Sequence, residues 1–201
     1  MKKKRKKRSE GYFKRNYSES WNYIKESKNF IYIIIGLFLI FILIGFFIPV
    51  PKNLLEQILK FIQELFEKTQ GMNVRELISF IFLNNLKSSF MGMIFGFVFG
   101  IFPLISTISN GYLLGFVSSI SVESQGISIL LRLFPHGIFE LPALFISLGL
   151  GLKFGTFIFQ KEKFNSFRRY FYNSLRVFFF IVLPLLIIAA IIEGSFIFLF
   201  K

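Results

Sequence analysis

Long apolar stretches alternate with short charged segments along this chain. The first stretch, Asn29 to Val50, contains no charged residue and is closed by Pro49 and Pro51. A helix needs about 20 apolar residues to cross the roughly 30 Å hydrocarbon core of a bilayer. The pattern therefore predicts a first transmembrane helix over about 30–50.

The central apolar stretch, 88–122, carries no charge and is punctuated by Pro103 and by Asn110-Gly111. Residues of these types interrupt helices or mark turns. One interpretation is a helix that crosses the membrane over about 77–102, followed by a short helix over about 106–121. The other interpretation is a re-entrant hairpin in place of two full spans.

The C-terminal half of the chain predicts two further spans. Segment 126–134 is expected to form a short interfacial helix that carries Arg132. Apolar runs then predict spans over about 135–159 and 177–200. The predicted fold class is all-α: a polytopic membrane helical bundle of about five transmembrane helices plus an amphipathic outer helix.

Segment 52–68 differs from the spans because its apolar residues occupy one helical face only. The apolar positions are Leu54, Leu55, Ile58, Phe61, Ile62, Leu65 and Phe66, and the charged positions are Lys52, Glu56, Lys60, Glu64, Glu67 and Lys68. This pattern predicts an amphipathic helix that lies on the membrane or on a partner protein. Its charges balance, so attraction to anionic lipid would contribute little.

The charge is concentrated at the N-terminus. Of the 201 residues, 54% are hydrophobic, yet the formal charge is +13, and residues 1–28 hold 11 Lys or Arg against three Glu. Such a run attracts anionic lipid by about 1 kcal/mol per basic residue near the surface, and it is also typical of nucleic-acid-binding arms. Beside an apolar span we favour the lipid bilayer over nucleic acid. We divide the chain into a basic cytoplasmic segment, 1–28, and one transmembrane domain, 29–201.

The distribution of basic residues predicts the orientation, because short cytoplasmic loops are enriched in Lys and Arg. With the N-terminus inside and the C-terminus outside, the inner segments 1–28 and 153–176 hold 17 basic residues, whereas the outer segments 51–76 and 118–134 hold five. We therefore expect a multi-pass protein of the cell membrane with a cytoplasmic N-terminus. Lys153 belongs to the inner charged segment in this scheme.

The composition excludes several classes of chemistry. The chain has no cysteine, which rules out disulfides, thiolate metal ligands and a cysteine nucleophile. Aspartate is also absent, so all 11 acidic residues are glutamates. No His-Glu-x-x-His, Gly-x-Ser-x-Gly or P-loop motif is present. We predict no catalytic residue, no metal site and no cofactor.

Small residues recur every four positions in the central stretches. They are Gly92, Gly96 and Gly100, then Gly111 and Gly115, and then Ala143, Ser147, Gly151 and Gly155. This spacing lets helix backbones approach closely, which favours association inside lipid. The pattern predicts helix–helix seams, either within one chain or between subunits of a homo-oligomer.

The candidate polar site lies in the segment 134–143. Pro135 suits the first turn of a helix, and His136 and Glu140 then stand one turn apart on the face that continues to Ala143. Pro142 cannot donate to the carbonyl of Ile138, so we expect a kink there. Ionisable groups inside hydrocarbon are costly and mark functional sites by default.

Few other polar residues are available to partner this pair. Asn84 and Asn85 lie near the start of the second span, Asn110 near the start of the third, and Glu193 in the last. One hypothesis is a buried cluster of His136, Glu140, Asn85, Asn110 and Glu193 that binds an ion, shuttles protons or grips a partner. The alternative is a structural network in which His136 and Glu140 satisfy each other.

These motifs together resemble the stage II sporulation protein M family. The resemblance rests on Asn84-Asn85, the glycine ladder, Asn110-Gly111 with Gly115, and Pro135-His136-Gly137 with Glu140 and Ala143, and it covers residues 70–160 in detail. It implies a polytopic membrane protein that holds peptidoglycan-degrading partners and is not itself the hydrolase. The chain departs from the family in its basic N-terminus and its amphipathic outer helix.

Three functional hypotheses follow, in order of preference. The first is a non-enzymatic scaffold or assembly subunit that contacts other membrane or cell-envelope proteins. The second is an ion or small-solute transporter or channel subunit that uses the polar cluster; the absence of an internal repeat argues against a complete transporter. The third is an intramembrane metal-dependent hydrolase, which would need more ligands than the sequence offers.

Overall fold

A computed structural model describes the backbone of residues 11–199 and the side chains of residues 11–129 and 137–198. Within this part of the chain every regular element is helical. The α-helices are α2 (Tyr12–Glu26), α3 (Lys28–Phe47), α4 (Lys52–Thr69), α5 (Val74–Ile94), α6 (Ile101–Gln125), α7 (Leu130–Gly155), α8 (Lys163–Val177) and α9 (Leu183–Leu199). Short 3-10 turns are η1 (Phe95–Phe97), η2 (Ile127–Ile129) and η3 (Thr156–Phe159), and η4 (Phe178–Val182) is a π-helix.

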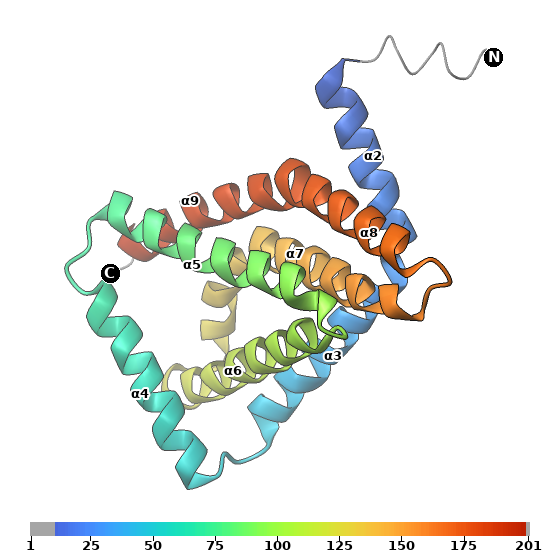
Figure 1. Cartoon of the computed structure of the whole chain (residues 1–201). Helices are drawn as coiled ribbons and strands as arrows, with labels where there is room; N and C mark the ends of the chain where they lie inside the picture. Colours follow the sequence, from blue (N-terminus) through green and yellow to red (C-terminus); the bar gives the residue numbers. More distant parts are fainter. Residues whose placement is uncertain (1–10, 200–201) are drawn as a thin grey trace.

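Five helical segments of the described chain are long and apolar enough to cross a membrane. They are Lys28–Phe47, Val74–Phe97, Ile101–Gln125, Gly137–Phe159 and Lys163–Phe198. The long helices form one bundle, with α2 and α8 at one end and α4 at the other (Figure 1). The prediction of an all-α bundle with five helices of membrane type is confirmed.

The turn between α5 and α6 lies earlier than the sequence pattern placed it. The predicted break near Pro103 is wrong: the chain reverses at Phe99 and Gly100, whose φ angles of 53° and 71° lie in the left-handed region. Pro103 falls in the first turn of α6, where a missing N–H is tolerated. The short helix expected over 106–121 is instead the 25-residue α6, about 37 Å long.

Helix α7 also begins earlier than expected. The chain forms the turn η2 and then enters α7 at Leu130, so a separate helix over 126–134 and a first turn at Pro135 are both wrong. The side chains of Arg132, Pro135 and His136 lie outside the described residues. The helical assignment continues through Pro142; the kink predicted there stays a prediction.

The last helical segment is longer than the predicted span of 177–200. Helices α8 and α9 are joined without a loop by the π-helix η4, which ends two residues before Pro184. A proline ring collides with the carbonyl four residues earlier, and a widened π-turn relieves such a collision. Pro184 therefore gives a physical reason for this local widening.

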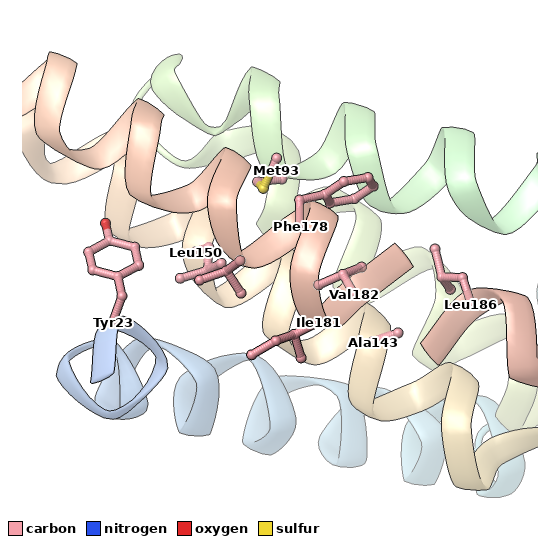
Figure 2. Close-up of a cluster of buried hydrophobic side chains, with 9 residues drawn as sticks. Tyr23, Met93, Ala143, Leu150, Phe178, Ile181, Val182 and Leu186 are labelled. Atoms are coloured by element: carbon pink, nitrogen blue, oxygen red, sulfur yellow. The ribbon is translucent and has the colours of Figure 1, made fainter. Parts of the chain in front are cut away.

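The main core lies where α5, α7, η4 and α9 meet. Its members are Tyr23, Met93, Ala143, Leu150, Val177, Phe178, Ile181, Val182 and Leu186. Figure 2 shows these side chains in a row from Tyr23 on α2 to Leu186 on α9. Close packing along this row aligns α7 with α9, and it thereby positions the polar groups that lie further along both helices.

The small-residue seams join helices of the same chain. A Cβ atom added to Gly111 would lie 2.7 Å from the carbonyl oxygen of Phe38 on α3, and one added to Gly151 would lie 2.6 Å from the carbonyl oxygen of Gly92 on α5. Ser147 Oγ donates to the carbonyl oxygen of Ser89 at 2.7 Å in the second seam. Gly96, Gly100, Gly115 and Gly155 likewise face atoms of neighbouring helices.

Gly137 is the exception among the predicted packing residues. An added Cβ would meet only the side chain of Leu141, on the same helix, within 4 Å. Gly137 instead lines a groove between α3, α6 and α7. It therefore contributes open space near the polar site rather than a helix seam.

Candidate functional site: a carboxyl pair beside an apolar groove

Three helices bring polar side chains together within the bundle. Glu140 of α7 forms side-chain hydrogen bonds with Glu193 of α9 and Asn85 of α5. The close approach of α5 and α9 comes from Gly194, where an added Cβ would lie 2.5 Å from Ile78 Cγ1. Ala143, which is fully buried, keeps the neighbouring turn of α7 in the core. Gly194 follows Glu193 directly, so this close packing of α9 on α5 lies beside the polar contact.

The chemistry of this contact constrains its charge. A hydrogen bond between two carboxyl groups needs a proton on one of them, and two adjacent carboxylates disfavour each other's ionisation. The contact between Glu140 and Glu193 therefore holds at least one proton and at most one negative charge. The Asn85 amide group donates to Glu140 and favours the ionised form of that carboxyl group.

A groove lies on the side of α7 that faces α3 and α6, and Glu140 belongs to its lining. It has a volume of about 820 Å³ and lies between α3, α6 and α7. Its walls are mainly aliphatic and aromatic, with Asn110, Ser118 and Glu140 as its polar lining. Glu140 therefore stands at a boundary, facing the groove on one side and Glu193 with Asn85 on the other.

Asn110 is near the predicted cluster without joining it. Its amide nitrogen donates to the carbonyl oxygen of Ser106 at 2.7 Å and lies 3.3 Å from Ser106 Oγ. Both contacts use the side-chain nitrogen, so the side-chain oxygen of Asn110, a lining residue of the groove, takes no part in them. Of the two neighbouring asparagines, Asn85 is half-buried at the cluster, whereas Asn84 is exposed.

His136 precedes Glu140 by four positions in α7, and its side chain lies outside the described residues. The structure thus brings together Glu140, Glu193 and Asn85 from the predicted cluster and places Asn110 across the groove. In the described part of the chain, no group of three or more His, Cys, Asp or Glu side chains could hold a metal ion.

A second polar centre was missed by sequence reasoning. Lys153, counted with the inner charged segment, lies near the end of α7 and is only 7% exposed. Its Nζ donates to Ser27 Oγ at 3.0 Å and lies 4.0 Å from the ring centroid of Tyr23. A second ring, that of Tyr170, lies 5.6 Å away. Lys153 carries the same charge as the basic residues that follow it in the sequence, so the pattern of charges gave no sign that Lys153 is buried.

The surroundings of Lys153 join α2 to α8. Burial raises the pKa of the Tyr23 hydroxyl above its ordinary value. Arg176 pairs with Glu19 at 2.8 Å, and Arg169 pairs with Glu26 at 3.3 Å in a more exposed position. Exposed pairs contribute little stability, so packing around Lys153 is the stronger link between these helices.

The bundle and its buried polar pair define a helical protein of membrane type, and comparison with known proteins specifies its family. The family model described as stage II sporulation protein M matches residues 34–196. The chain belongs to the stage II sporulation protein M family. The resemblance seen in the sequence is confirmed over most of the chain.

One curated relative is an uncharacterized protein of Methanocaldococcus jannaschii. It is 37% identical to this chain over 75 residues, which cover 36% of this chain and 42% of the relative. The match thus spans less than half of that protein's length. No solved structure matches the chain.

Proposed function

We propose that this chain is a multi-pass membrane protein that serves as a non-enzymatic assembly subunit of a membrane complex, with its N-terminus in the cytoplasm. The distribution of charge supports the orientation. Figure 1 places α2 and α8 at one end of the bundle, and these helices carry Lys14, Arg15, Lys25, Lys163, Arg168, Arg169 and Arg176. Basic residues are typical of the cytoplasmic side.

Helix α4 is the observation that carries the assembly role. It has 18 residues, connects α3 to α5 at the far end of the bundle and makes no extended contact with any other described helix. Ile58 is its one buried residue, whereas Phe61 and Phe66 are 48% and 63% exposed. An apolar helical face of this kind needs a surface to cover it.

The charges of α4 favour a protein over anionic lipid as that surface. Its three lysines and three glutamates cancel, whereas interfacial lipid-binding helices are rich in Lys and Arg on their polar face. A partner helix can bury an apolar stripe with i, i+3 and i+4 spacing and leave alternating charges at its edges. The proposed occupant is an amphipathic helix of another membrane or cell-envelope protein.

Site-specific photocross-linking in native membranes tests this role. A photoreactive residue at Phe61 reports on the apolar stripe, and one at Lys60 on the opposite face serves as the matched control. We expect Phe61 to give one defined protein adduct, identified by mass spectrometry, and Lys60 to give none. Adducts with lipid alone, or with a second copy of the chain, would count against a heteromeric assembly role.

A second candidate function is supported by the carboxyl pair. Glu140 and Glu193 are hydrogen-bonded inside the bundle, beside a groove, and ionisable groups within membrane helices frequently belong to proton or ion pathways. In this role the chain is an ion or small-solute translocation subunit. Measuring the flux of ions or small solutes into proteoliposomes tests this role. Glu140→Gln should abolish the flux, and a flux rate equal to that of the parent chain would show that Glu140 takes no part in the mechanism.

A further inference from the structure

The groove between α3, α6 and α7 has the size and the lining of a binding site for an apolar molecule. Phe38, Phe46 and Phe145 contribute aromatic walls, and most of its remaining lining is aliphatic. The volume of about 820 Å³ falls within the range of small-molecule sites, roughly 300–1,000 Å³, which combine apolar walls with a few polar groups. Phe38 and Phe46 lie eight residues apart on α3, so the groove extends about 12 Å along that helix.

The polar groups in the groove favour a positive charge. Glu140 presents a carboxyl group whose ionised form a bound cation would stabilise, and the side-chain oxygen of Asn110, another lining residue, is a second acceptor. No lysine or arginine is among the described residues that line the groove. A carboxylate in apolar surroundings is stabilised by a positive charge placed close to it. A ligand can supply that charge.

The aromatic walls strengthen this preference. The rings of Phe38 and Phe145 meet edge to face with centroids 5.0 Å apart. Phe38 is buried, so the half-buried rings of Phe46 and Phe145 are the ones that a ligand in the groove can contact. The faces of aromatic rings attract organic cations, above all when water is excluded. A small hydrated metal ion would find too few oxygen ligands here, because such ions take six or more. A carboxyl group, aromatic rings and few oxygen ligands together favour a cation that carries apolar groups.

We propose that this groove binds a lipophilic organic cation, such as a quaternary ammonium or phosphonium compound, with Glu140 as its counter-charge and the phenylalanine rings around its apolar groups. Binding at the groove is independent of the assembly role carried by α4. It also names a ligand class for the second candidate function. Equilibrium binding and flux are separate measurements, so a site that binds without transport is distinguishable from no site.

Two probes of nearly equal shape test the charge preference. Methyltriphenylphosphonium and triphenylphosphine oxide differ by a methyl group in place of an oxygen, and only the first is charged. Equilibrium dialysis against purified full-length protein in mild detergent, corrected for detergent alone, gives both affinities. We expect saturable binding of one cation per chain and at least tenfold weaker binding of the neutral probe, since an unpaired buried charge is costly. Equal binding of both probes would overturn the proposal.

Variants then assign the site. Glu140→Gln should weaken cation binding by at least tenfold, the scale of losing one partner of a buried charge pair, whereas Glu123→Gln, an exposed glutamate at the end of α6, should leave it unchanged. Leu113→Trp provides a second test, because the indole would occupy the groove without touching the charge. Cation affinity that survives both Glu140→Gln and Leu113→Trp refutes the assignment to this groove.

Discussion

Lys153 Nζ and Ser27 Oγ are hydrogen-bonded at 3.0 Å although the two residues lie 126 positions apart. Ser27 separates α2 from α3, and its hydroxyl also donates to the Tyr23 carbonyl oxygen at 2.7 Å. The hydroxyl thus donates to one group and accepts from the other. This contact ties α7 to the point at which the chain passes from α2 into the first apolar helix.

Loss of the Lys153 side chain should destabilise the bundle. Lys153→Ala removes the hydrogen bond to Ser27, the contact with the Tyr23 ring and buried packing, so we expect a loss of about 2 kcal/mol in the free energy of unfolding. Lys163→Ala, an exposed position at the start of α8, is the matched control. Thermal unfolding in detergent measures both variants, and equal midpoints would show that the Lys153 contact contributes nothing.

The buried Tyr23 hydroxyl predicts a loss of stability in alkaline solution. Its pKa is raised in the folded state, so its contribution is fully present below the unfolded pKa of about 10 and is lost as the pH rises above that value. Tyr23→Phe should therefore flatten the decline of the unfolding midpoint above about pH 10. Tyr12→Phe, at an exposed tyrosine of the same helix, should leave the decline unchanged. Identical pH profiles for Tyr23→Phe and the parent chain would contradict this explanation.

Two glycine substitutions separate close packing from helix propensity. A Cβ at Gly151 would lie 2.6 Å from the carbonyl oxygen of Gly92 and 2.9 Å from Met93 Cα, whereas a Cβ at Gly36 in α3 would meet nothing within 4 Å. We expect Gly151→Ala to cost about 1–3 kcal/mol through overpacking, and Gly36→Ala to be neutral or stabilising by up to about 1 kcal/mol. The same unfolding assay measures both, and a tolerated Gly151→Ala would be incompatible with the α5–α7 seam.

Neighbouring asparagines provide an internal control for the carboxyl pair. Asn85→Ala removes a donor to Glu140, and leaving a buried polar group without its partner costs about 1–3 kcal/mol. Asn84→Ala alters an exposed side chain one position earlier and should be silent. If thermal unfolding shows equal effects for the two variants, Asn85 has no special role in the cluster.

The sequence pattern predicted the parts of this fold that depend on periodicity. Apolar stretches of span length predicted five helices of membrane type, and the four-residue repeat through Ala143 and Gly151 predicted the seams. The same repeat placed Glu140 on the face that turns into the bundle, where it meets Glu193 and Asn85. Periodicity works here because it depends only on helix geometry.

Features that depend on tertiary context were not predictable. Pro103 and Gly100 both suggest a turn, and only the packing of Gly100 against Leu152 with its positive φ distinguishes the reversal from a first-turn proline. In the sequence, Lys153 resembles a loop residue. Its burial depends on contacts with Tyr23 and Ser27, which belong to a distant segment of the chain. The groove likewise exists only between helices, so no local pattern reports it.

The assembly role of α4 is tested most directly by changing its apolar face without touching the bundle. Phe61→Glu combined with Phe66→Glu alters two exposed positions of a helix that makes no extended contact with its own described chain. We expect an unchanged unfolding midpoint for the purified protein, together with a shift from a larger complex to the free chain in native electrophoresis of mildly solubilised membranes. A complex of undiminished size, with the fold intact, would contradict it.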